Sequence, residues 1–198
     1  MGTRIYFLKP KSDLSLAQHL ERDYPEFRDW MIIENLKSQK EDNEDRISLG
    51  LQQFLEDNEY YSTEIKVNQN IIDELVSAYL LAYCDLGPGQ SNFELVGPLL
   101  NRFRYEELSK SVKSLGDPHL IQIFKYLLGG RSLLNNAPFS PSFEQSTGWW
   151  TPDEQDFIVK HLGQLRLSYE ESELVHSLVE FINELEPKSD LIIVAENN

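Results

Sequence analysis

The sequence predicts a single α+β domain, with a small sheet of about three strands covered by roughly eight helices. The chain has 198 residues, a usual size for one folded domain. Apolar residues make up 40% and charged residues 26% of it, so a hydrophobic core can form. Several segments space their apolar residues with the period of a helix, and a few short runs have the pattern of a strand. No internal repeat divides the chain, so residues 1–198 are expected to form one unit.

Three segments are predicted as strands. Residues 3–8 are short and rich in β-forming side chains. Residues 61–67 alternate apolar and polar positions, which indicates a strand with one exposed face. Residues 191–194 are all apolar, which indicates a strand covered on both faces. We expect the first and the last of these strands to lie next to each other.

Four helices carry start or stop signals. A stripe of apolar residues predicts a helix over residues 70–84, followed by a Gly-Pro-Gly sequence. Asp117 is the predicted cap of a helix over residues 120–128, because a proline follows it at the first helical position. Thr151 and Glu154 have the spacing of a capping box, and predict a helix through about residue 165.

The fourth helix begins with a second capping box, formed by Ser168 and Glu171, and ends before Pro187. Apolar spacing alone predicts further helices over residues 14–23, 27–36, 47–55, 93–103 and 105–115. Residues 38–45 are entirely polar and are expected to be a loop. Residues 131–150 contain two prolines, a glycine and four aromatic residues, and are expected to be a long loop. Ordered loops of that length usually serve a site or pack on the body of the protein.

The charge of the chain is strongly negative and is concentrated in two segments. The formal net charge is −15, from 18 basic and 33 acidic residues. Residues 41–60 contain one basic and seven acidic residues, and residues 144–198 contain three and twelve. Nucleic acid and anionic membranes are therefore not expected as partners, because both attract basic surfaces. A single cysteine and the absence of a long apolar run lead us to expect a cytoplasmic protein without disulfides.

No motif for a cofactor, a nucleotide or a metal is present in the sequence. The four histidines are too far apart for two of them to bind one metal from the same helix. We expect His161 to be a packed core residue and His176 to be exposed. Cys84 follows an apolar stripe and is expected to be buried and unreactive. We therefore expect no cofactor, no metal and no catalytic residue.

Two adjacent tryptophans give the strongest interaction signal. One of Trp149 and Trp150 is expected to fold back on the helix that begins after Thr151. The other is expected to anchor a protein partner, because aromatic side chains dominate the binding energy of interfaces.

Several short sequences resemble a family of uncharacterised bacterial proteins that is known as YfbM-like. The resemblance rests on the start MGTRIYFL with Asp13-Leu14, on KYLLGG at residues 125–130, and on WTPDE at residues 150–154 leading to His161-Leu162. It also includes a final helix that leads into residues 191–194, and it covers about a third of the chain. The resemblance implies an α+β architecture and no catalytic residue.

The function we favour is that of a non-enzymatic recognition protein whose acidic segments bind a basic protein partner from one side of the fold. An inhibitor or immunity protein against a nucleic-acid-binding toxin would act in this way, because carboxylates can imitate phosphates. The expected contacts, besides the tryptophans, are Glu41, Asp42, Glu44, Asp45, Glu56, Asp57 and Glu59, with Glu170, Glu171 and Glu173 as a second cluster.

Two alternatives remain open. The first is an enzyme or small-ligand-binding protein with a pocket under residues 131–150, with His119, Arg131 and Trp150 near the floor of the pocket. The second is an oligomeric structural subunit, which requires a large exposed apolar helix face.

Overall fold

A computed structural model describes residues 3–40, 47–62, 65, 68–81, 93–132, 145–163, 165, 169–185 and 188–197. In these ranges the chain forms seven helices and one sheet of four antiparallel strands, so the α+β class is confirmed. The sheet has one strand more than expected. The strands are β1 (Thr3–Pro10), β2 (Phe93–Asn101), β3 (Gln145–Trp150) and β4 (Leu191–Asn197). The helices are α1 (Leu16–Lys40), α2 (Leu49–Asp57), α3 (Gln69–Leu81), α4 (Arg102–Ser114), α5 (Pro118–Gly129), α6 (Pro152–Leu162) and α7 (Tyr169–Glu184).

The first and last strands form the centre of the sheet, as expected. The strand order is β2-β1-β4-β3, and Phe7 of β1 lies opposite Ile193 of β4. Residues 191–195 are all buried, so β4 is covered on both faces as its unbroken apolar run predicts.

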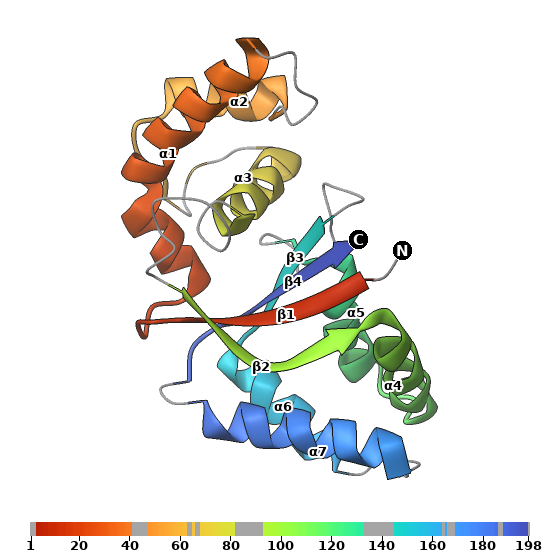
Figure 1. Cartoon of the computed structure of the whole chain (residues 1–198). Helices are drawn as coiled ribbons and strands as arrows, with labels where there is room; N and C mark the ends of the chain where they lie inside the picture. The colour runs from red at the N-terminus through yellow and green to blue at the C-terminus, as the bar shows by residue number, and fades with distance from the viewer. Residues whose placement is uncertain are drawn as a thin grey trace.

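The sheet separates two layers of helices (Figure 1). Helices α1 and α3 lie on one side, with α2 packed against them, and α4, α5, α6 and α7 lie on the other. Successive residues of a strand point to opposite faces, so neighbouring residues enter different cores. Ile192 and Trp149 pack with α1–α3, whereas Ile193 and Trp150 pack with α4–α7. Two hydrophobic cores therefore share one sheet.

Two of the predicted helix caps are present, those at Asp117 and Thr151. Asp117 accepts hydrogen bonds from the backbone amides of His119 and Leu120, at 2.9 and 3.0 Å. The Thr151 hydroxyl accepts from the Glu154 amide, and the Glu154 carboxylate accepts from the Thr151 amide. Each cap satisfies amides that have no partner within their own helix. Ser168 lies outside the described residues.

Helix α1 spans two segments that the sequence predicts as separate helices. It continues through Pro25, which cannot donate to the carbonyl of Glu21. Leu20, Tyr24 and Phe27 are fully buried against one core on both sides of the proline. Their burial stabilises the continuous helix by more than the lost hydrogen bond and the steric clash destabilise it.

Three other expectations are corrected. The segment expected to be a helix over residues 93–103 is mostly strand β2, and α4 begins at Arg102. Its Gly97 has φ 72° where the pairing of β2 with β1 shifts register, and a Cβ there would lie 2.7 Å from the Phe181 ring. The end of the expected loop over residues 131–150 is strand β3. Residues 61, 62 and 65 are in no strand, and the Tyr61 side chain is buried in the core beneath α1.

Candidate functional site

The described members of the two expected acidic clusters lie on opposite sides of the sheet. Glu56, Asp57 and Glu59 are exposed at the end of α2 and just beyond it, whereas Glu173 is exposed on α7. Helices α2 and α7 lie on opposite sides of the sheet (Figure 1). The expectation that both clusters face one side is therefore corrected. The other expected contacts lie outside the described residues: Glu41, Asp42, Glu44 and Asp45, and the side chains of Glu170 and Glu171.

Both tryptophans are buried, at 4% exposure for Trp149 and 0% for Trp150. Trp150 donates a hydrogen bond from Nε1 to the carbonyl of Ile123, at 3.0 Å. The indole of Trp149 lies against the guanidinium of Arg131, 4.9 Å from the ring centre. The two cores, one on each face of strand β3, account for both side chains. The surface anchor for a partner is therefore not at Trp149 or Trp150.

The three residues of the alternative pocket do not converge. Arg131 is buried, and its Nη1 donates to the Glu154 carboxylate at 2.6 Å and to the Trp149 carbonyl at 2.8 Å. His119 is exposed near the start of α5, whereas Arg131 follows the end of that helix. Residues 133–144, which were expected to cover the pocket, lie outside the described residues. The polar groups of Arg131 are thus used inside the protein.

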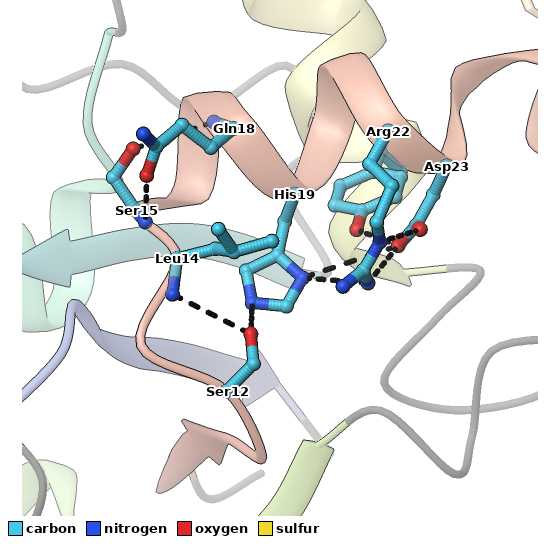
Figure 2. Close-up of polar contacts among 8 residues, drawn as sticks. Ser12, Leu14, Ser15, Gln18, His19, Arg22 and Asp23 are labelled. Carbon is cyan, nitrogen blue, oxygen red and sulfur yellow. Dashed lines mark hydrogen bonds and ion pairs between the residues drawn. The ribbon is translucent and has the colours of Figure 1, made fainter.

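A buried histidine that sequence reasoning did not single out lies at the start of α1 (Figure 2). The His19 imidazole lies between Ser12 and Arg22: Nε2 is 2.9 Å from the Ser12 hydroxyl and Nδ1 is 3.0 Å from Arg22 Nη2. The Arg22 guanidinium also donates to both carboxylate oxygens of Asp23, at 2.6 and 3.0 Å. Tyr79 of α3 donates to the same carboxylate at 2.8 Å.

These contacts determine which nitrogen of His19 carries the proton. A guanidinium has only donors, so Nδ1 must accept from Arg22. The neutral imidazole is then protonated on Nε2, which donates to the Ser12 hydroxyl. Burial lowers the pKa of His19, and the charge of Arg22 lowers it further, against the opposing effect of Asp23. In this state His19 cannot take the hydroxyl proton of Ser12, as the base beside a nucleophilic serine does.

The contacts around His19 and Asp190 fix the start of α1. The Asp190 carboxylate accepts from the amide of Leu16, the first residue of α1, at 2.7 Å. A carboxylate is favoured there by the helix dipole. Burial raises the pKa of Asp190, while the Leu16 amide and Arg131 lower it. Together these groups attach α1 to the sheet and to α3.

Apolar side chains are exposed on the outer part of α1 and α2. Ile33 and Leu36 of α1 are about half exposed, and Leu49 of α2 is 83% exposed. A hollow of about 50 Å³ lies between the two helices; its lining residues are Ile32, Asn35, Leu36, Ile47, Gln52, Leu55 and Glu56. We call this hollow and the exposed residues around it the α1–α2 surface. Its charged members are Glu26, Arg28, Asp29, Glu34, Lys37, Glu56, Asp57 and Glu59.

The α1–α2 surface has an excess of negative charge. Its two basic residues each pair with a carboxylate, Arg28 with Asp29 at 2.8 Å and Lys37 with Glu34 at 2.5 Å. The other four carboxylates, those of Glu26, Glu56, Asp57 and Glu59, form no ion pair with a lysine or arginine of the described chain. The surface thus combines exposed apolar groups with carboxylates that no described basic residue neutralises.

A buried amide with an unused acceptor lines the hollow. Asn35 is 6% exposed and donates from Nδ2 to Gln52 Oε1, at 3.2 Å. Its Oδ1 accepts no hydrogen bond within the described structure. Neither the hollow nor Asn35 was singled out from the sequence. The sequence does contain a sign of this surface. Ile33 and Leu36 are apolar, but they do not lie on the apolar stripe of α1 that includes Phe27 and Met31.

The described part of the chain contains no group of three His, Cys, Asp or Glu side chains arranged to hold a metal ion. None of the helices described combines the length and the apolarity that crossing a membrane requires. No family model, curated protein or solved structure matches the chain.

Proposed function

We propose that this protein is a non-enzymatic recognition protein that binds a basic protein partner through the α1–α2 surface. An inhibitor or immunity protein of a toxin that binds nucleic acid would act in this way. The observation that carries the proposal is a group of exposed apolar side chains and four carboxylates on α1, on α2 or just beyond α2. None of the four carboxylates pairs with a basic residue in the described part of the chain.

Electrostatics supports a basic partner. Like charges on neighbouring helices repel each other, so an uncompensated cluster lowers the stability of the free protein slightly. A basic partner relieves this repulsion, and the long-range attraction speeds its approach. A nucleic acid or an anionic membrane would instead be repelled.

Burial of the exposed apolar residues at an interface supplies binding free energy that ion pairs alone do not. Surface ion pairs contribute about 0–1 kcal/mol each, because water and salt screen them. Burying an exposed leucine side chain contributes roughly 1.5–3 kcal/mol. Leu36 and Leu49 therefore fit the role of anchors, with the carboxylates as a polar rim that sets orientation and specificity.

The acidic residues of α7 are not part of this surface, since they lie beyond the other face of the sheet. We assign no second function to the region of Arg131 and Trp150, because the polar groups of both side chains bond to other groups of the protein.

The test is capture of proteins from an extract of the source organism by the immobilised chain, at 50 and 500 mM salt. The wild-type chain is compared with the variant Glu26→Gln/Asp57→Asn/Glu59→Gln, which leaves the hollow intact. We expect the wild-type chain to retain basic proteins at low salt, and both high salt and the triple variant to release them. The affinity of a captured and purified protein should fall at least tenfold in the variant.

A matched control is Glu173→Gln on α7, which changes charge on the opposite side of the sheet and should leave retention unchanged. The proposal is wrong if the retained proteins bind equally well to the triple variant, or if their affinity is the same at both salt concentrations.

A further inference from the structure

We infer that this protein self-associates head to tail, through contact between the outer face of α4 and the α1–α2 surface of a second copy. This contact shares the α1–α2 surface with the proposed function, but it does not require the basic partner proposed there.

The large apolar side chains that are exposed on the described chain gather in two places. Ile33, Leu36 and Leu49 belong to the α1–α2 surface, and Tyr60 lies just beyond the end of α2. The other exposed one is Phe103 of α4, at 67% exposure. Burying such groups against one another is favourable, because it removes apolar surface from water. The α1–α2 surface and α4 thus each offer an apolar contact.

Helix α4 turns Phe103 toward solvent. Leu108 and Val112 are the buried residues of this helix. Phe103 precedes Leu108 by five positions, which places the two residues about 140° apart around the helix axis. Lys110 follows Phe103 by about two turns, so it lies on the same side of the helix, and it is exposed as well. The phenyl ring therefore points away from the core that α4 helps to form.

Basic residues accompany Phe103 on α4. This helix contains four basic and two acidic residues, although the whole chain has a net charge of −15. Arg104, Lys110 and Lys113 are exposed, and they form no ion pair with a carboxylate of the described chain. We call the exposed aromatic and charged residues of this helix the α4 face: Arg102, Phe103, Arg104, Glu106, Lys110 and Lys113.

The α4 face and the α1–α2 surface are complementary. The carboxylates of the α1–α2 surface outnumber its two basic residues, whereas the basic residues of the α4 face outnumber its single carboxylate. In both places the charges lie on the same elements as exposed apolar side chains. Interfaces commonly combine an apolar centre with a polar rim. Opposite charges on the two rims favour this pairing over contact between two α4 faces or between two α1–α2 surfaces.

The two surfaces can meet only between different molecules. Helices α1 and α2 lie on one side of the sheet, and α4 lies on the other (Figure 1). A copy that uses its α4 face therefore leaves its α1–α2 surface open to the next copy. Because the two surfaces lie on opposite sides, two copies cannot make both contacts with each other at once, and association continues beyond a dimer.

The net charge of −15 weakens this contact without preventing it at physiological salt. Repulsion between whole molecules acts over long distances, whereas the screening length at physiological salt is about 8 Å. Charges that touch across an interface lie closer than this, so they still attract each other. We expect a dissociation constant of about 0.1 mM for each contact, in the range of weak associations.

The experiment is sedimentation equilibrium of the purified full chain at physiological salt. The concentration runs from about 20 µM to 1 mM, which brackets the expected dissociation constant. We expect the average mass to rise above the 23.0 kDa of one chain and to continue past the mass of a dimer as the concentration increases.

Two variants each remove the apolar contact from one surface. Phe103→Ser changes the α4 face, and Leu36→Ser/Leu49→Ser changes the α1–α2 surface. The three side chains are about half exposed or more, so the fold should be retained, which circular dichroism and thermal unfolding verify. Each variant alone should associate at least tenfold more weakly than the wild-type chain. An equimolar mixture should form a complex of one chain of each variant and stop there, because only that pairing joins an intact α4 face to an intact α1–α2 surface.

A third variant tests the charges. Lys110→Gln/Lys113→Gln should weaken the association about threefold, because it removes two positive charges from the α4 face. The matched control is Lys160→Gln, which removes an exposed positive charge from α6 on the same side of the sheet and should associate as the wild-type chain does.

A constant mass of one chain over the whole concentration range would overturn the inference. A wild-type mass that levels off at a dimer, a mixture of the two serine variants that stays monomeric, or unchanged association of Lys110→Gln/Lys113→Gln would overturn it too. If self-association fails while salt-dependent retention of basic proteins persists, the proposed function stands. If self-association behaves as expected but no basic protein depends on Glu26, Asp57 and Glu59, the proposed function is wrong and the head-to-tail contact stands.

Discussion

His19 is neutral in the folded protein because both of its ring nitrogens are used by neighbours. Burial and Arg22 lower its pKa below the ordinary value of 6.5, so the unfolded chain binds more protons than the folded chain between the two values. We expect the free energy of unfolding to fall as the pH is lowered through this window, and His19 to contribute no pH dependence above about 6.5. Denaturant unfolding between pH 4.5 and 8 measures this effect.

The variant His19→Asn isolates the histidine, because its amide has a donor and an acceptor but does not titrate. The pH dependence of the free energy of unfolding that His19 contributes below pH 6.5 should be absent in this variant. Asp190 acts in the opposite direction, since its raised pKa makes unfolding easier as the pH increases through its own titration. An identical pH profile for the variant and the wild-type chain would show that His19 is not the source of this pH dependence.

The residues of the candidate site differ in how far the sequence reveals them. Glu56, Asp57 and Glu59 are found by counting charges, because an acidic cluster at the end of an amphipathic helix is usually exposed. Asn35 is not found, because it becomes notable only when Gln52, 17 positions later, meets it across a helix pair. A hydrogen bond between separate elements leaves no pattern in the local sequence.

Glu154, which completes the capping box at the start of α6, also neutralises the charge of the buried Arg131. The Glu154 carboxylate accepts from both the Thr151 amide and the Arg131 guanidinium, whose side chain is 4% exposed. We expect Thr151→Ala to lower the free energy of unfolding by about 1 kcal/mol. Glu154→Ala should lower it by about 3–5 kcal/mol, because it removes the carboxylate that contacts the buried Arg131 guanidinium at 2.6 Å. Chemical denaturation of the two variants gives both values.

The control for the value of Glu154→Ala is the double variant Arg131→Met/Glu154→Leu, in which both charges of this ion pair are removed. It should recover a large part of the stability lost in Glu154→Ala, since apolar pairs often replace buried ion pairs without loss. Equal stability of Thr151→Ala and Glu154→Ala would contradict the role we assign to the ion pair.

Elements with strong local signals are predicted well, and those with weak signals are not. Caps and stripes place α3, α5 and α6 to within a few residues, because these signals act between neighbours in sequence. Strand β2 is different: a short apolar run fits a helix and a strand equally well, and Gly97 and Pro98 disfavour both. Pairing with β1, which lies more than eighty positions earlier, decides the outcome.

Strand β3 shows the same limitation. Its six residues QSTGWW have little strand pattern, and β4 stabilises them by pairing along their length. Once the strand forms, alternation sends Trp149 and Trp150 to opposite faces, and both become core residues. The sequence shows two adjacent tryptophans, but it does not show that both faces of this strand are covered and bury them.

The whole molecule is expected to unfold as one unit, because both cores are attached to the same strands. Ile192 and Ile193 are adjacent in β4, and each is almost completely buried in a different core. We expect Ile192→Ala and Ile193→Ala each to lower the free energy of unfolding by about 2–5 kcal/mol. Both should keep a single transition, followed by tryptophan fluorescence and by far-ultraviolet circular dichroism.

Two separate transitions in either variant would show that the helical layers fold independently. A matched comparison is Ile33→Ala on the exposed part of α1, which should change the stability by no more than about 0.5 kcal/mol.

The central pair of the sheet has a consequence for synthesis on the ribosome. Strand β1 is translated before every other described element, and β4, its partner along one edge, is translated after all of them. During most of translation the nascent chain therefore carries an apolar strand with an open edge, which is the kind of segment that associates with other nascent chains. The seven acidic residues of positions 41–60, which are translated soon after β1, repel such chains from one another until β4 is made and the edge closes.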